Sequence, residues 1–328
     1  MSPAVGTPKE TEAGKRPPRL LRGMPWLVWR QHRTALVACL VLAASACVYM
    51  LWERAAAVDY LAGGRAGATD GEFRMAFQNT AYASAFQNGS WMMSMLPVVA
   101  GVFLGAPLIA GDLERGTLKL VTTQSMTRRR WLATKTGVAV LVTLVCSVVL
   151  SAAFSYWWRA VHGVTFADWT ESGDFDTTGP MPVALSLLYL AVGIALGVAV
   201  RRVVPAMVLT FGFGFAMNLV WDRIRLLPFT PRQITNPVEQ GQPAVPAGGA
   251  RFDNWTVDAQ GKLHGFGACA NEHTPAQCRA DKGIVAERLE YFAHDQMSGM
   301  QWTWAGILLA AALVIAGLTV WWIRRRPL

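Results

Sequence analysis

The sequence has little charge and lacks the short motifs that mark common hydrolases. Asp, Glu, Lys and Arg make up only 16% of its 328 residues, whereas a soluble domain carries about 25%. Neither GxSxG nor HExxH occurs, and no histidine falls within a hydrophobic run, where it could pair with an acid. These absences argue against hydrolytic chemistry. A membrane enzyme is therefore the least favoured function, and we expect no catalytic or metal-binding residue.

A phosphate-binding loop is also missing. No GxxxxGK[ST] pattern occurs, and residues 211–218 (FGFGFAMN) share only glycines with such loops. Glycine in a membrane helix is ordinarily a packing residue. We therefore expect no directly bound cofactor, and any ATP and Mg would be used by a separate chain. The net charge of +9 reflects membrane topology, as argued below, so no nucleic-acid partner is expected.

Cysteine is scarce, and its five residues form two groups. Three lie in hydrophobic runs and are interpreted as buried small residues: Cys39, Cys47 and Cys146. Cys269 and Cys278 share one long polar loop, where oxidising conditions would allow a disulfide. Free thiols are one alternative. A metal site with His264, His273 or His294 is another, although the spacing matches no compact zinc pattern.

Hydrophobic residues make up 53% of the chain and collect into six runs that are nearly free of charge. Each run is long enough for a helix to cross about 30 Å of hydrocarbon. They predict an all-α polytopic membrane protein with six transmembrane helices, at 34–52, 91–110, 136–158, 183–200, 203–220 and 302–323.

Only Arg201 and Arg202 separate the fourth and fifth runs. In one long hydrophobic hairpin these arginines would lie at the bilayer centre. Such a position would cost about 5 to 7 kcal/mol even on a lenient insertion scale. We therefore expect a turn at the membrane surface.

Lys and Arg are unequally distributed between the two sides of the predicted bundle. One side, formed by residues 1–33, 112–135, 201–202 and 324–328, carries 18 basic and four acidic residues. The other side carries 12 basic and 17 acidic residues. The positive-inside rule then predicts a cell-membrane protein with both termini in the cytoplasm. Most of the 14 Trp lie at predicted boundaries, which is typical of an aromatic belt.

The remaining segments divide into a tail, a short helix and three outer loops. Residues 1–20 read as a disordered cytoplasmic tail, because they are polar and lack the features of a cleavable signal. Residues 21–33, with WLVWRQHR, predict an interfacial helix, the alternative being a disordered basic tail. The first outer loop could hold a helix returning to the surface, and the second is acidic. The third, 221–301, is a large extracellular loop whose end (GIVAERLEYFAHDQM) has helical apolar spacing.

Few polar residues interrupt the predicted spans. They are Thr143, Ser147, Ser151, Thr210 and Asn218. Ser and Thr in membrane helices most often bond their own backbone or a neighbouring helix. Weak candidates for a substrate pathway are Asn218, Thr210 and Ser147. Asn218 lies near the outer end of its predicted span, so a role at the membrane interface is the alternative for this residue.

Residues 112–135 form a charged, turn-rich segment between the second and third spans. Gly111 and Gly116 allow a helix to break just past the membrane, and TLKLV then presents Leu118 and Leu120. Ser125 or Thr127 can cap the next helix. A short apolar element with charged flanks can transmit a push from a docked protein. The plainer interpretation is a cytoplasmic loop that only sets topology.

The stretch ERGTLKL, followed by a Ser/Thr–Arg cluster and a Lys leading into a span, resembles the permease subunits of type-2 ABC transporters. The WLVWRQHR opening is similar to actinobacterial members of that family. The resemblance implies that Glu114, Gly116 and Thr117 belong to the region that seats on an ATP-binding subunit. With the other residues of the segment, the candidate ATPase-coupling set is Glu114, Arg115, Gly116, Thr117, Leu118, Leu120, Thr123, Ser125 and Arg128.

The family resemblance also implies an assembly. It consists of this permease, a second identical or homologous permease chain, and two copies of the ABC ATP-binding subunit in the lipid bilayer. Such permeases usually export lipids, drugs, peptides or polysaccharides. The competing hypothesis is a non-transporting membrane sensor or immunity-type scaffold whose outer loop binds a ligand.

Overall fold

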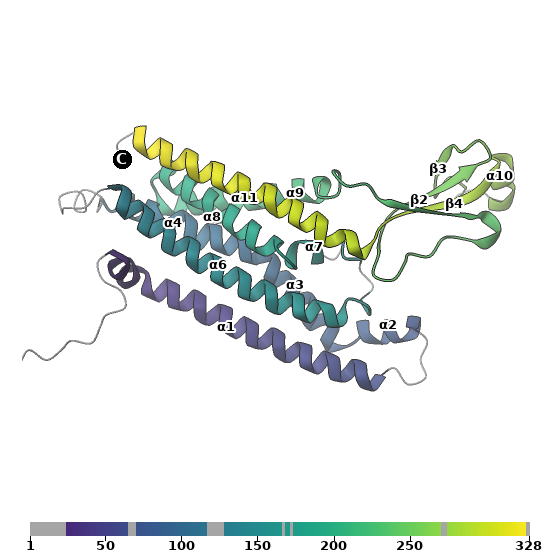
Figure 1. Cartoon of the computed structure of the whole chain (residues 1–328), viewed down its shortest axis with the longest axis horizontal. Coiled ribbons are helices and arrows are strands. Elements are labelled where there is room, and N and C mark those ends of the chain that lie inside the picture. Colours follow the sequence, from purple (N-terminus) through teal and green to yellow (C-terminus); the bar gives the residue numbers. More distant parts are fainter. Residues whose placement is uncertain are drawn as a thin grey trace, which may run out of the picture.

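Long helices form a bundle, and a small sheet projects from one end of it (Figure 1). The computed structural model describes residues 24–64, 70–116, 128–165, 168–170, 173–269 and 274–325. The helices are α1 (Met24–Gly64), α2 (Asp70–Gln78), α3 (Ala81–Val99), η1 (Ala100–Gly105), α4 (Ala106–Glu114), α6 (Arg128–Val161), α7 (Asp174–Thr177), α8 (Met181–Val200), α9 (Val203–Ile224), η2 (Val238–Gln240), α10 (Pro275–Asp281) and α11 (His294–Arg325). The strands are β1 (Arg232–Pro237), β2 (Ala250–Asp258), β3 (Leu263–Gly265) and β4 (Ile284–Phe292).

Six helices among the described residues are long and apolar enough to cross a membrane, which confirms the predicted number. They are Leu36–Gly63, Ala81–Glu114, Arg130–Val161, Met181–Val200, Val203–Ile224 and His294–Arg325. The second begins ten residues before the predicted span, at Ala81, because the Thr80 side chain caps α3 there by accepting a hydrogen bond from the Ala83 N–H. No break separates residues 24–33 from the first span, since α1 is one helix. The tail over residues 1–20 lies outside the described part.

The second membrane helix changes its winding midway. Its π-helical turn η1 follows Pro97, which lacks an N–H group and disrupts the normal hydrogen bonding of a helix. Here the chain packs closely on α8. A Cβ atom added at Gly193 would lie 2.3 Å from the carbonyl oxygen of Gly101. Only glycine fits this approach, so small residues bring the two backbones together.

Aromatic side chains fill the core of the half of the bundle that lies nearer the sheet. Trp157 and Phe154 are both 0% exposed. Phe86 stacks on Phe154 and meets Trp157 edge to face, with centroid distances of 5.3 and 5.4 Å. The predicted aromatic belt therefore accounts for only some of the tryptophans. Five of the boundary Trp are buried in the core: Trp131, Trp157, Trp158, Trp221 and Trp304.

The segment between α9 and α11, predicted as the last outer loop, folds into a four-stranded antiparallel sheet, in the order β1-β4-β2-β3. The helical spacing predicted near its end is wrong, because those residues form β4. Glu287, Leu289 and Tyr291 are buried while Arg288 and Glu290 between them are only partly so, which is the two-residue period of a strand. β4 pairs with both β1 and β2, so hydrogen bonds to other strands overrode the apolar spacing. The all-α prediction holds for the bundle but did not include this sheet.

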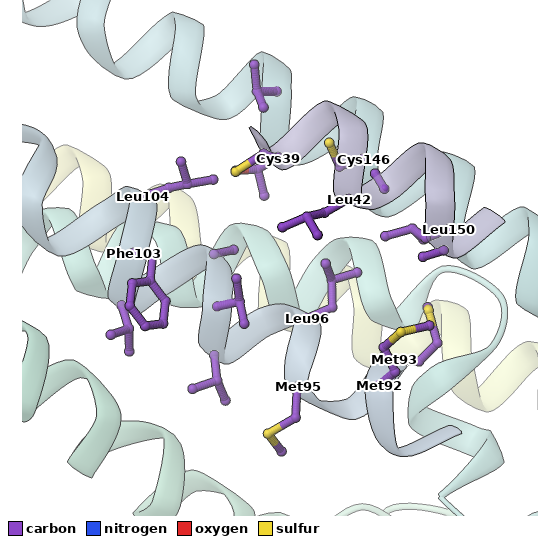
Figure 2. Close-up of a pocket in the computed structure, with 18 of the residues that line it drawn as sticks. Cys39, Leu42, Met92, Met93, Met95, Leu96, Phe103, Leu104, Cys146 and Leu150 are labelled. Carbon is purple, nitrogen blue, oxygen red and sulfur yellow. The ribbon is translucent and has the colours of Figure 1, made fainter. Parts of the chain in front are cut away.

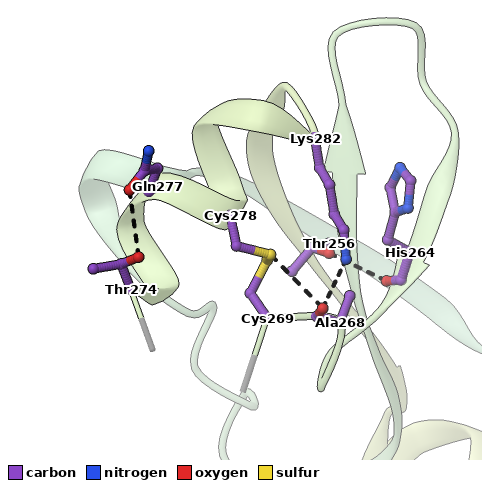
Figure 3. Close-up of a disulfide and its surroundings, with 8 residues drawn as sticks. All are labelled: Thr256, His264, Ala268, Cys269, Thr274, Gln277, Cys278 and Lys282. Atoms are coloured by element: carbon purple, nitrogen blue, oxygen red, sulfur yellow. Dashed lines mark hydrogen bonds between the residues drawn. A yellow bond between two sulfur atoms is a disulfide. The ribbon is translucent and has the colours of Figure 1, made fainter. Parts of the chain in front are cut away.

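A disulfide joins Cys269 to Cys278 between β3 and β4 (Figure 3). Cys278 belongs to α10, and the ammonium of Lys282 donates a 2.7 Å hydrogen bond to the carbonyl oxygen of Ala268. His264 lies 2.9 Å from the carboxylate of Asp258. Because the two sulfur atoms are bonded to each other, neither is available as a metal ligand, and no group of three metal-ligating side chains occurs in the described residues.

Breaking this bridge should destabilise the outer sheet. Cys269→Ser with Cys278→Ser should lower its free energy of unfolding by roughly 2 to 3 kcal/mol, because the bridge restricts the unfolded chain. Mass spectrometry of non-reduced peptides should show the two cysteines linked in protein from oxidising conditions. Recovery of two free thiols there would contradict the assignment.

Candidate functional site

The predicted coupling segment begins and ends at the end of the bundle that lies opposite the sheet. Figure 1 shows α4, the start of α6 and the C-terminal end of α11 together there. Residues 117–127 lie outside the described residues, and so do five of the predicted coupling residues: Thr117, Leu118, Leu120, Thr123 and Ser125. Arg128 is the first residue of α6. The structure therefore describes what holds the two ends of the segment.

A buried ion pair joins these two ends. Lys135 of α6 donates a hydrogen bond to the carboxylate of Asp112 in α4. Lys135 is 1% exposed and Asp112 is 8% exposed, and the Lys135 nitrogen lies 5.2 Å from the centre of the Trp131 ring. Removing one partner of a buried pair leaves an uncompensated charge. The pair thus fixes α4 to α6 across the coupling segment.

Glu114 makes a contact that its sequence position did not indicate. Its carboxylate accepts a 2.9 Å hydrogen bond from the backbone N–H of Val203, the first residue of α9. N–H groups in the first turn of a helix have no partner within that helix, and its N-terminus favours negative charge. Glu114 therefore ties the end of α4 to the start of α9.

The two residues after Glu114 end the helix. The guanidinium of Arg115 donates to the carbonyl oxygen of Gly111 at 2.8 Å, and it lies 3.9 Å from the Asp112 carboxylate. Gly116 has a φ of +66°, the left-handed conformation that commonly follows a helix. The helix therefore ends just before Gly116, one of the two glycines predicted to allow a break, and continues through the other, Gly111, which is buried within α4.

The turn between α8 and α9 borders the same end. α8 ends at Val200 and α9 begins at Val203, so Arg201 and Arg202 form the predicted turn between two separate helices. Arg201 has a φ of +61° and closes α8 through its backbone N–H, which bonds to the carbonyl oxygen of Gly197. Two exposed basic residues thus directly precede Val203, the residue at the start of α9 that bonds Glu114.

The sequence missed a polar cluster at the opposite end. Arg225, which is 8% exposed, donates to the Asp176 carboxylate at 2.9 Å and to the Thr170 carbonyl oxygen at 2.6 Å. The indole N–H of Trp221 also donates to Asp176, and that of Trp304 donates to the Arg225 carbonyl oxygen. Burial raises the pKa of Asp176, although Arg225 opposes this effect. The only feature of the sequence that pointed to this cluster was the acidic composition of the second predicted outer loop.

The part of the chain that holds both ends of the coupling segment matches a known protein family. The model of the family described as "ABC-2 membrane transporter related" matches residues 36–225, more than half of the chain. The chain belongs to the ABC-2 membrane transporter related family. No curated protein and no solved structure matches. The ABC-2 match ends at Arg225, so the sheet and α11 lie outside it.

Membership in the ABC-2 family identifies the chain as a multi-pass membrane permease of an ABC transporter. Members of this family are generally non-catalytic and typically work with an ATP-binding subunit. The matched region contains α4, the Asp112–Lys135 pair and the Glu114–Val203 contact. These two contacts therefore lie within the part of the chain that matches the family.

A cavity with a volume of about 940 Å³ lies in the bundle of this ABC-2 permease. Its walls come from α1, α3, η1, α6 and α9. Figure 2 shows apolar and sulfur-containing side chains pointing into it, among them Leu96, Phe103, Cys39 and Cys146. Of the three cysteines predicted to be buried, only Cys146 is fully so.

The three weak pathway candidates do not line this cavity. Ser147 and Thr210 are each 0% exposed, and their hydroxyls bond backbone oxygens of their own helices, Leu144 and Ala206. Asn218 is exposed on α9. The structure thus gives Ser147 and Thr210 the ordinary role of a polar residue in a membrane helix and does not bring the three together.

Proposed function

We propose that the chain is the membrane-spanning subunit of an ATP-driven exporter, coupled to a separate ATP-binding subunit through residues 112–135. The observation that carries the proposal is the buried Asp112–Lys135 pair, which holds both ends of that segment. A force applied between these ends would act on α4 and α6 together. The Glu114–Val203 contact would pass it to α9.

The proposed assembly contains two ATP-binding subunits and two permease chains, the second identical to this one or homologous. ATP and Mg would be used by the ATP-binding subunits. Both termini and the coupling segment would face the cytoplasm of a cell-membrane protein, and the sheet would face outward. Two features support this orientation. The side that contains the coupling segment carries the basic excess. The sheet carries the disulfide, and disulfides persist in oxidising compartments.

Replacing the two leucines of the segment should release the ATP-binding subunit. Loss of a buried apolar anchor from an interface commonly costs about 1 to 3 kcal/mol, whereas a rim charge costs less. We expect that Leu118→Ala with Leu120→Ala will abolish copurification of the ATP-binding subunit from membranes. Arg128→Ala should change it little, because neighbouring arginines keep the positive charge.

The control pair is Leu209→Ala with Leu219→Ala, whose side chains are exposed on α9. All variants must insert to the same level as the wild type. If the Leu118/Leu120 pair still captures the ATP-binding subunit at the wild-type yield and transports fully, the segment only sets topology. If the wild type binds no ATP-binding subunit, the sensor or scaffold hypothesis replaces transport.

A further inference from the structure

We propose that each protomer binds one long-chain amphiphile, with its alkyl chain in the cavity of Figure 2 and its polar head near Lys135. This inference rests on the proposed function, because the amphiphile would be the class of substrate that the exporter carries. Three observations lead to it: an apolar chamber, an unpaired hydroxyl in its wall, and a second cavity with polar groups at one end.

The apolar chamber is large enough for a ligand and opens at the surface of the bundle, where its lining residues Leu42, Trp91 and Phe103 are exposed. Its volume of about 940 Å³ is near the upper end of the range of roughly 300 to 1,000 Å³ found for ligand sites. Five of its lining residues are methionines: Met50, Met92, Met93, Met95 and Met207. Methionine is flexible and polarisable, so it adapts to ligands of irregular shape. Among the described residues, no Asp, Glu, Lys or Arg lines the chamber, which favours an uncharged chain.

One polar side chain in the wall has no protein partner in the described residues. Thr143 of α6 is 4% exposed, and its hydroxyl makes no hydrogen bond to another described group. The hydroxyl of Ser45, which also lines the chamber, bonds the Leu42 carbonyl oxygen instead. A buried hydroxyl without a partner is uncommon. A ligand atom in the chamber could supply the missing hydrogen bond.

A second cavity continues toward the coupling end of the bundle. Its volume is about 530 Å³, and Phe103 and Leu104 line both cavities. Its polar lining includes Lys135, Arg115 and Glu114. The two cavities together are apolar in the middle of the bundle and polar at one end. A molecule of matching shape has a long chain and a polar head.

The polar end favours a head that accepts hydrogen bonds. Lys135 has three N–H donors, of which Asp112 takes one, and Arg115 has five, of which Gly111 takes one. The Arg115 side chain is 70% exposed, so it can reach a ligand. Glu114 offsets part of the positive charge, but its carboxylate is already bonded to Val203. A carboxylate or phosphate head fits this surplus of donors.

The test uses the full-length protein in phosphatidylcholine nanodiscs without the ATP-binding subunit. The probe is palmitic acid carrying a photoreactive diazirine in its chain, and the comparison probe is the corresponding hexadecanol. Labelled peptides are identified by mass spectrometry. We expect saturable labelling within 92–104 and 142–150, competed by unlabelled palmitic acid and by hexadecyl phosphate. Labelling spread evenly over the lipid-facing residues of α9 would overturn the inference.

Matched variants sharpen the result. Leu96→Trp fills the chamber and should weaken labelling about tenfold, equivalent to a tenfold change in affinity. Leu209→Trp, on the exposed face of α9, should not change it. Arg115→Gln should reduce labelling by the acid to that of the alcohol and leave the alcohol unaffected. Equal labelling of Leu96→Trp and wild type would contradict the chamber assignment, as would crosslinking there to a second protomer in place of the probe.

This experiment is independent of the coupling assignment. Probe binding in a protein that captures no ATP-binding subunit would uphold the amphiphile site and contradict the transport function. Capture of the ATP-binding subunit without saturable labelling would uphold the transport function and contradict the amphiphile site.

Discussion

Lys135→Met should sharply lower the yield and thermal stability of the folded permease. Lys135 is 1% exposed and bonds Asp112, so its loss leaves a carboxylate buried without its main cation. Breaking such a pair on one side costs about 3 to 5 kcal/mol. Arg115 lies 3.9 Å from Asp112, but its side chain is largely exposed and compensates only weakly. The measurement is thermal unfolding of the purified protein in detergent.

The double variant Lys135→Met with Asp112→Asn separates the charge from the packing. It removes both charges at once, so most of the lost stability should return. Arg130→Met is the matched control, because Arg130 is an exposed basic residue on the same helix. A Lys135→Met protein as stable as the Arg130→Met protein would mean that the ion pair does not hold the two ends of the coupling segment.

Arg225→Met should have a comparable effect at the other end of the bundle. Arg225 bonds Asp176 and the Thr170 carbonyl oxygen, so its loss removes the cation beside Asp176, which keeps the Trp221 N–H, and removes the guanidinium donor of the Thr170 carbonyl oxygen. We expect a loss of about 3 to 5 kcal/mol at neutral pH, measured by thermal unfolding. Arg223→Met is the control, because Arg223 lies two residues away and is exposed.

The Arg225 effect should depend on pH in one direction. Burial raises the pKa of Asp176, and Arg225 opposes this, so removing Arg225 raises that pKa further. A buried acid with a raised pKa binds its proton more readily in the folded state than in the unfolded state. The folded variant should therefore regain stability relative to the wild type as pH falls through that pKa. A loss that stays constant from pH 8 to pH 5 would show that Asp176 does not carry the effect.

The sequence by itself determined the membrane helices and the turn between α8 and α9. Long apolar runs can satisfy their backbone groups in lipid only as helices, so length and composition were sufficient. Arg201 and Arg202 marked the turn because two charges cannot lie cheaply in hydrocarbon. The disulfide between Cys269 and Cys278 was predicted because both lie in one polar loop, whereas only the structure decided between it and the alternatives of free thiols or a metal site.

The tertiary structure decided what the local pattern left open. The residues of β4 carry helical apolar spacing, and pairing with β1 and β2 overrode it. Asp112 and Lys135 are 23 residues apart, and Glu114 and Val203 are 89 apart, so neither contact follows from local spacing. The cavity is lined by residues of four membrane helices, each unremarkable in sequence. Apolar residues specify burial without naming a partner, and only packing determines which surfaces meet and where space remains between them.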